Sequence, residues 1–240
     1  MKFDSTLIET PISRRDFITT TSTLAGVLAF GSILSSPTSL RAEANVISPD
    51  AVLDILHAGN ERYLNGTTHK HDFHADRAEL ALSQHPIAAV LSCSDSRVVP
   101  QFAFDQGSGR LFVVRVAGNI ANNHGIASLE YAVKYLKTPL IYVLGHTSCG
   151  AVDAAIKVVK DGAEFPGELP GLVASIARAV HVSGSKAGDL LTNTVKENVR
   201  LTVAQLVNSS QIIQSRVQSG QLRVVGGVYE LASGKVSLVT

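Results

Sequence analysis

Two cysteines and one histidine stand where a metal ion could be held. Cys93 follows the apolar run 87–91, and Cys149 follows the apolar run 140–144 with His146 three residues before it. If both runs are buried strands, two thiols and an imidazole lie at strand ends. Such a set supplies three of the four ligands that zinc takes in proteins. Thiolates also favour zinc over hard cations such as magnesium and calcium.

The cysteine pair has two other interpretations. A disulfide would suit an exported protein, and two buried, unreactive thiols are common in protein cores. Neither interpretation explains why His146 precedes Cys149 by three residues, or why Asp95 and Arg97 follow Cys93. We therefore favour zinc and keep the other two interpretations open.

The acidic and basic residues beside Cys93 decide what a metal could do there. Asp95 could close the site as a fourth ligand, which would make the site structural. Alternatively, Asp95 could pair with Arg97 in a bidentate bond and leave the fourth position to water, whose pKa zinc lowers. Asp95 could then orient a zinc-bound hydroxide by accepting a hydrogen bond from it. A surface salt bridge or a cap is the alternative explanation of this pair, although surface pairs rarely sit at strand ends beside two thiols.

A parallel sheet is expected to position these residues. Short continuous apolar runs are typical of strands buried on both faces, and segments with helical periodicity alternate with them. The expected strands are 87–92, 111–116, 140–144 and 224–231, with an antiparallel edge at 236–239. The expected helices include one from Pro49, then 125–137, 150–160 and 190–220, the last broken near 208–210.

This pattern predicts an α/β fold with a central, mostly parallel β-sheet of about four strands plus an edge strand, flanked by helices. In such sheets the ligand site lies outside the carboxyl ends of the strands. Both cysteine motifs fall at carboxyl ends, so we expect them to share one site.

The first 44 residues differ in character from the rest. Arg14 and Arg15 precede an apolar residue, a mildly apolar stretch follows over 21–34, and 42–44 has the small-x-small pattern of a signal-peptidase site. The arrangement resembles a twin-arginine export signal of bacteria, with an ordinary secretory signal as the alternative. The apolar stretch is too short and too polar for a convincing membrane span. We expect export to the periplasm, or to the thylakoid lumen of a cyanobacterium, with no stable membrane insertion after cleavage.

Residues 45–240 are then one domain, with an N-terminal helical arm over about 48–85 and an α/β core over about 86–240. The whole chain has 240 residues, a net charge of +1 and an apolar fraction of 45%. Because the acidic and basic charges nearly cancel, the composition gives no electrostatic reason to expect nucleic-acid binding. His69, His71 and His74 share one polar segment of the arm and could bind metal, although a solvated loop explains them more simply.

Four short motifs follow one another along the core: 93–97 (CSDSR), 112–119 (FVVRVAGN), 128–133 (SLEYAV) and 145–150 (GHTSCG). In order and spacing they resemble the beta-class carbonic anhydrases over roughly residues 50–239. The resemblance implies one zinc ion per subunit on Cys93, His146 and Cys149, with Asp95 and Arg97 as the catalytic dyad. Asp95 would bind the metal only in a closed state. The implied reaction is the reversible hydration of CO2 to bicarbonate and a proton by zinc-bound hydroxide.

The plant-like branch of this family lines its substrate pocket with a Gln, a Phe and a Tyr. The resemblance places these roles on Gln84, Phe112 and Tyr131, and it implies a close backbone approach to the metal at Gly150. Plain core packing is an equally good explanation of Phe112. The resemblance also implies a homodimer or a larger homo-oligomer built from dimers, in which Gln84 and Tyr131 act on the neighbouring subunit's zinc.

One position departs from a regulated branch of the family, which has a Trp three residues before the first zinc cysteine and a non-catalytic bicarbonate pocket there. Val90 holds that position, and the chain contains no Trp. We therefore do not expect this pocket, and we expect the water-bound form of the enzyme to predominate near neutral pH.

Other functions remain compatible with the same ligands. A hydrolase for a CO2-like molecule such as carbon disulfide would use them with a different access tunnel. A non-catalytic zinc protein would close its site with Asp95, but such a site has no need of Arg97. A thiol redox role is disfavoured because no Cys-x-x-Cys motif is present.

Overall fold

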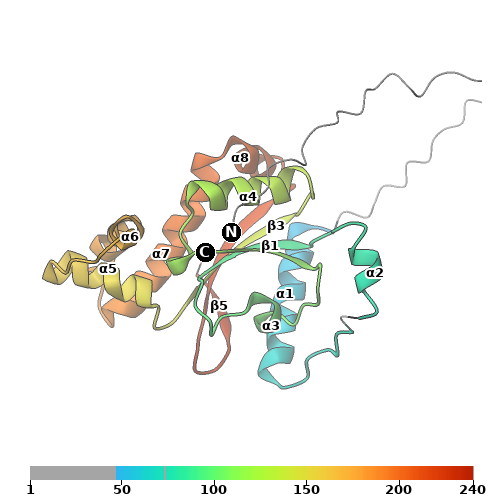
Figure 1. Cartoon of the computed structure of the whole chain (residues 1–240), viewed down its shortest axis with the longest axis horizontal. Helices are drawn as coiled ribbons and strands as arrows, with labels where there is room; N and C mark the ends of the chain where they lie inside the picture. The colour runs from blue at the N-terminus through green and yellow to red at the C-terminus, as the bar shows by residue number, and fades with distance from the viewer. Residues whose placement is uncertain (1–46, 73, 240) are drawn as a thin grey trace, which may run out of the picture. The chain divides into compact units, whose positions relative to one another are not determined.

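A five-stranded sheet forms the centre of the computed structural model, which describes residues 47–72 and 74–239 (Figure 1). The strand order is β2-β1-β3-β4-β5, and only β5 runs antiparallel to its neighbour. The strands are β1 (Ala88–Ser92), β2 (Leu111–Arg115), β3 (Leu140–His146), β4 (Arg223–Tyr229) and β5 (Val236–Leu238). The predicted mostly parallel α/β sheet with an antiparallel edge is therefore confirmed. The expected signal peptide, 1–44, lies outside the described residues.

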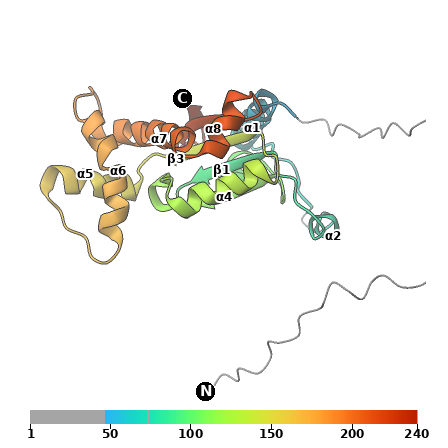
Figure 2. The ribbon, with the colours of Figure 1, turned by 90° about the horizontal axis from the view of Figure 1, so that it is seen from above.

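Helices cover both faces of this sheet (Figures 1 and 2). They are α1 (Pro49–Leu64), α2 (Arg77–Leu80), α3 (Pro100–Ala103), α4 (Asn123–Lys134), α5 (Gly150–Asp161), α6 (Leu169–Ser183), α7 (Leu190–Ser209) and α8 (Gln211–Gln218). In Figure 1, α4 and α8 lie above the strands and α1 and α3 lie below them. Within the described ranges, no helix is both long enough and apolar enough to cross a membrane.

Local sequence signals explain most of the helix ends. Ser48 caps α1 through a bond from the Ala51 N–H to its Oγ (3.2 Å), as its place before Pro49 suggests. The predicted break near 208–210 occurs at Ser210, which is extended and caps α8. The predicted helix 125–137 was wrong at both ends. Asn122 caps α4, so the helix begins at Asn123, two residues earlier than predicted. At the other end, Lys137 adopts a left-handed φ of 58° that a helix does not continue through.

Side-chain alternation along the strands divides the core into two layers. Leu91 and Val143 face the layer that α4 to α8 cover, whereas Val90 and Tyr142 face the layer that α1 and α3 cover. Both faces are therefore buried, which explains why the strands read as continuous apolar runs in the sequence.

The register of β1 and β3 positions the site. The two strands are parallel neighbours, with Ser92 opposite Leu144. Cys93 follows β1 directly, and His146 is the last residue of β3, two residues beyond the predicted strand end. β4 ends at Tyr229, earlier than predicted, and the Leu231 N–H bonds instead to Thr147 Oγ1 (3.0 Å). The carboxyl ends of β1, β3 and β4 thus meet at one edge of the sheet.

Candidate metal centre

Cys93, His146 and Cys149 lie together at this edge, and all three are buried. Their possible ligand atoms, the two Sγ atoms and one imidazole nitrogen, all lie within 4.8 Å of one another. Both cysteines are free thiols. Across residues 47–72 and 74–239, this is the group of three or more His, Cys, Asp or Glu side chains that is close enough to hold a metal ion.

The orientation of His146 suits a metal ligand. Its Nδ1 lies 2.9 Å from the Thr147 carbonyl oxygen, so an Nδ1–H donates to that carbonyl and leaves the lone pair on Nε2. Nε2 is buried, and no described residue forms a hydrogen bond with it. An unpaired buried nitrogen costs free energy. A zinc ion would satisfy it and accept both sulfurs, so the residues present fit this metal.

Backbone N–H groups support both sulfurs. The Gly118 N–H donates to Cys93 Sγ at 3.3 Å. Cys149 is the N-cap of α5, and the N–H groups of Ala151 and Val152 point to its sulfur. Hydrogen bonds to a thiolate and a helix N-terminus both favour negative charge on sulfur. The site is therefore prepared for thiolate rather than thiol.

The two thiols also affect each other's pKa, in opposite directions. The pKa of Cys93 falls to about 4, chiefly because the Cys149 thiol donates to its sulfur and despite the opposing effect of burial. The pKa of Cys149 is raised by that same bond to Cys93 and by burial. Burial alone would lower the pKa of His146, but the Cys93 side chain, the Thr147 carbonyl and Asp95 together raise it. The cluster therefore favours a thiolate at Cys93, with the proton kept on Cys149 and positive charge favoured on His146.

Arg97 holds Asp95 beside the cluster. Nε of Arg97 donates to Asp95 Oδ1 (2.9 Å) and Nη2 to Oδ2 (2.7 Å), while the Arg97 backbone N–H also donates to Oδ1 (3.0 Å). These hydrogen bonds hold the pKa of the Asp95 carboxyl well below its usual range. Asp95 Oδ2 lies 3.8 Å from His146 Nε2. The structure therefore places an ionised carboxylate, already paired with Arg97, next to the ligand cluster.

Arg115 is a residue of this site that the sequence analysis missed. It ends β2, and its side chain donates to the Cys93 carbonyl (3.0 Å) and to the Asp95 carbonyl (2.6 Å). Arg115 thereby holds the loop that carries one metal ligand and the carboxylate of the dyad. The available signal was its position in the second motif, at the end of a strand expected to neighbour the strand before Cys93.

Of the residues with predicted substrate roles, Gly150 directly follows Cys149, and the other three lie on other elements. Gln84 is exposed in the loop that precedes β1, whereas Cys93 follows β1 at its other end. Phe112 on β2 is half-buried, and its ring centroid lies 6.3 Å from that of Tyr131 on α4, which is 47% exposed. A Cβ atom at Gly150 would meet no heavy atom within 4 Å among the described residues. The space beside Gly150 is open among these residues, and the expected backbone approach to the metal stays a prediction.

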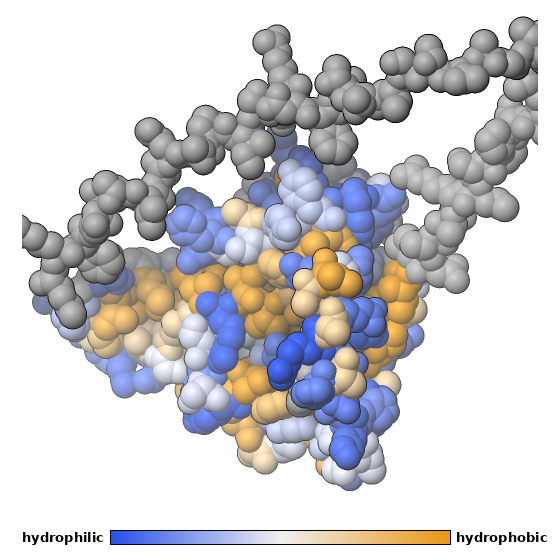
Figure 3. Space-filling model, turned by 45° about the vertical axis from the view of Figure 1, so that its right-hand side comes forward, coloured by the Kyte–Doolittle hydropathy of each residue, from blue (hydrophilic) through white to orange (hydrophobic). Residues whose placement is uncertain are grey.

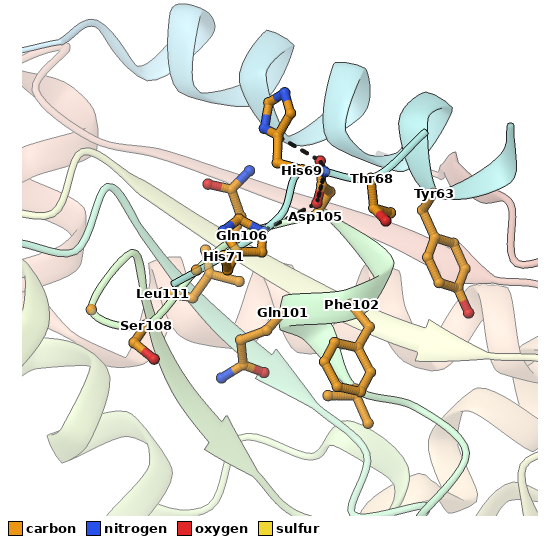
Figure 4. Close-up of a pocket in the computed structure, with 13 residues that line it drawn as sticks. Tyr63, Thr68, His69, His71, Gln101, Phe102, Asp105, Gln106, Ser108 and Leu111 are labelled. Atoms are coloured by element: carbon orange, nitrogen blue, oxygen red, sulfur yellow. Dashed lines mark hydrogen bonds and ion pairs between the residues drawn. The ribbon is translucent and has the colours of Figure 1, made fainter. Parts of the chain in front are cut away.

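The histidine segment of the arm packs on a different part of the domain (Figure 4). The buried carboxylate of Asp105 pairs with Arg62 (2.5 Å), His71 (3.2 Å) and His69 (3.6 Å). Asp105 and the two histidines also line a cavity of about 590 Å³. His74 is exposed. The segment is largely exposed, as expected of a loop, but two of its three imidazoles contact a buried acid.

Comparison with known proteins identifies the family. A family model described as carbonic anhydrase matches residues 88–236. Carbonic anhydrase 2 of Mycobacterium tuberculosis is 38% identical over 192 residues, which cover 80% of this chain and 93% of that protein. The solved structure of the beta-carbonic anhydrase CcaA is 30% identical, with a TM-score of 0.60 over 78% of this chain and 86% of that one. A beta-carbonic anhydrase of Sordaria macrospora shares the fold, with a TM-score of 0.62 at 21% identity over 75% of this chain and 90% of that one. The chain therefore belongs to the beta-class carbonic anhydrases and is an enzyme of that family.

Proposed function

We propose that the protein catalyses the zinc-dependent, reversible hydration of CO2 to bicarbonate and a proton. The observation that carries the proposal is the buried cluster of Cys93, His146 and Cys149, in which His146 Nε2 lacks a hydrogen-bond partner among the described residues. These three side chains would hold the zinc ion. When bound, zinc acts as a Lewis acid that lowers the pKa of water and so supplies a nucleophile near neutral pH.

The chain's own residues orient the reaction. Arg97 occupies both carboxylate oxygens of Asp95, which keeps Asp95 ionised and favours its pairing over metal ligation. Asp95 can then accept a hydrogen bond from the attacking group and fix the direction of its lone pair. Arg115 holds the backbone of the same loop in place. Asp95 is in this scheme an orienting acceptor, and Arg97 decides its orientation.

Stopped-flow CO2 hydration by residues 45–240 tests the proposal. We expect one zinc ion per chain by elemental analysis, and a catalysed rate that chelation abolishes and added zinc restores. A protein that holds zinc but gives no rate above buffer would count against catalysis. A rate that is indifferent to complete removal of metal would count against the zinc.

We also propose that the enzyme works as a homodimer or a larger assembly of dimers, in which Gln84 and Tyr131 serve the neighbouring subunit's zinc. Three observations support this. β2 is an edge strand of the described sheet, with partly exposed side chains. Figure 3 shows broad apolar areas on the surface, and the exposed large apolar residues include Phe102, Tyr131 and Tyr135. The two Sordaria macrospora relatives are described as tetrameric.

Mixed dimers test the assignment to the neighbouring subunit. A Gln84→Ala subunit and a Cys93→Ser subunit are each expected to give inactive or weak homodimers. Refolded together, they would form dimers with one intact zinc site facing one intact Gln84, and part of the activity would return. No recovery in samples that native mass spectrometry shows to contain mixed dimers would contradict the assignment.

For localisation we propose export through the twin-arginine route, supported by the Arg14-Arg15 pair and the small-x-small pattern at 42–44. Replacing Arg14 and Arg15 together by Lys is expected to leave the precursor in the cytoplasm of a bacterial host. Unchanged arrival of the processed enzyme in the periplasm would contradict this route.

A further inference from the structure

A buried asparagine lies behind the metal centre. Asn198 on α7 is 4% exposed, and its Nδ2 donates to the Gly118 carbonyl at 2.8 Å. The two residues are 80 positions apart in the sequence. This bond therefore ties α7 to the short helical turn Ala117–Asn119 that follows β2.

The same turn contacts a ligand from its other side. The Gly118 N–H donates to Cys93 Sγ at 3.3 Å. Gly118 has a φ of +69°, and a Cβ atom there would lie 2.7 Å from Ile176 Cδ1. The carbonyl bond to Asn198 and the N–H bond to Cys93 act on the two sides of one α-carbon, so each constrains the direction of the other.

We infer that Asn198 is a positioning residue for the ligand Cys93, acting through Gly118, whose N–H it aims at the sulfur. The inference rests on the proposed function, because it takes Cys93 as a zinc ligand. A hydrogen bond to a thiolate withdraws electron density from sulfur, so the sulfur donates less charge to the metal. Partners outside the ligand set are typically worth about 10- to 100-fold in metal affinity or activity.

A second residue of α7 offers a matched control. Gln205 also bonds to this loop, with its Nε2 donating to the Ala121 carbonyl at 3.0 Å. Asn198 and Gln205 line the same cavity of about 70 Å³. Gln205 thus anchors the same loop to the same helix, but it does not bond to the residue whose N–H contacts Cys93. A purely structural role of α7 would make the two residues equivalent.

The experiment compares cobalt(II)-loaded wild type with Asn198→Leu, Asn198→Asp and Gln205→Met. Leu keeps the number and branching of the side-chain heavy atoms of Asn, and ionised Asp keeps its shape, but neither donates to the Gly118 carbonyl. Loss of the N–H···S bond raises the energy of the sulfur lone pairs. We therefore expect the thiolate-to-cobalt charge-transfer band to move to longer wavelength in both Asn198 variants. We also expect chelators to remove the metal about tenfold faster from them. Gln205→Met should match wild type in both measurements.

Unchanged bands in folded Asn198 variants, or an equal shift in Gln205→Met, would overturn the inference. A wild-type protein without any thiolate-to-cobalt band would overturn the proposed metal site itself, so the two failures are distinguishable. If neither Asn198 variant folds, cadmium-113-loaded wild type labelled with 15N-glycine decides the matter. Coupling between the Gly118 amide proton and cadmium is expected across the N–H···S bond, and its absence would overturn the inference.

Discussion

A substitution at Asn60 tests how α1 is attached to the rest of the domain. This side chain of α1 is 2% exposed and makes three hydrogen bonds. Its Nδ2 donates to the carbonyls of Ala103 (2.8 Å) and Gly234 (2.9 Å), and its Oδ1 accepts from the Val236 N–H (2.8 Å). One amide therefore connects α1 to the end of α3 and to the turn between β4 and β5.

Replacing Asn60 by Leu keeps the number and branching of the side-chain heavy atoms, so the main loss is hydrogen bonding. Two buried carbonyls and one buried N–H would lose a partner, at about 1 kcal/mol each, which lowers the free energy of unfolding by about 3 kcal/mol. With a urea dependence of about 2 kcal/mol per molar, the unfolding midpoint would fall by about 1.5 M.

Urea unfolding of the zinc-loaded protein, followed by circular dichroism at one protein concentration, measures this change. Asn193→Leu is the control, because the one bond from its amide, to the Ala187 carbonyl (3.0 Å), lies at the surface. The control should change the free energy of unfolding by less than about 0.5 kcal/mol. A loss below about 1 kcal/mol for Asn60→Leu, or one equal to the control, would refute the role given to these three bonds.

Other predictions concern the site and its surroundings. Asp95→Asn should lower kcat/KM for CO2 hydration about 100-fold or more with zinc content unchanged, and a full rate in stopped flow would remove Asp95 from the dyad. Removal of the metal should lower Tm in a thermal scan, because a ligand bound only by the folded state stabilises it; an unchanged Tm would contradict tight binding at a structured site. Arg115→Met should raise the metal dissociation constant about tenfold in chelator competition, with partial rescue by Arg115→Lys. Equal metal affinity of wild type and both variants would contradict the role of Arg115 in holding this loop. Burial alone would raise the pKa of Asp105, but Arg62 and the His69 N–H outweigh it and lower that pKa. The stabilisation by Asp105 is therefore present above about pH 4 and is lost as the pH falls through the lowered value, so Asp105→Asn should show a flatter loss of stability in acid unfolding. Parallel acid profiles of the two proteins would contradict this.

Much of the fold could be predicted because its signals are local. Continuous apolar runs in the sequence were enough to predict β1, β2 and β3. Ser48-Pro49 marked the start of α1, and the polar segment at 208–210 marked the break between α7 and α8. The prediction extended α4 too far at its C-terminal end. The chain leaves the helical conformation by Lys137, which has a left-handed φ, and lysine has no particular preference for that conformation, so no sequence signal marked this end.

The candidate site was also predictable only in part. Cys93 and Cys149 were identified by their residue type, and their positions after parallel strands gave a reason to expect them at one site. No sequence signal indicated Arg115, Asn60 and Asn198, because each is an ordinary polar residue whose partners are backbone groups far away in the chain. A backbone carbonyl has the same chemistry at every position, so no sequence pattern identifies which one a side chain will reach.

Residue type and spacing were enough to identify the two cysteines, the imidazole and the Asp95–Arg97 pair, because such side chains are rare and stand at predicted strand ends. Three features became visible in the folded structure: Arg97 bonds both oxygens of Asp95, His146 turns an unpaired Nε2 toward the sulfurs, and α7 reaches Gly118 behind Cys93. It also showed that the described chain does not crowd Gly150. Ligand identity is a property of residue type, whereas ligand orientation depends on hydrogen bonds between elements that folding alone brings together.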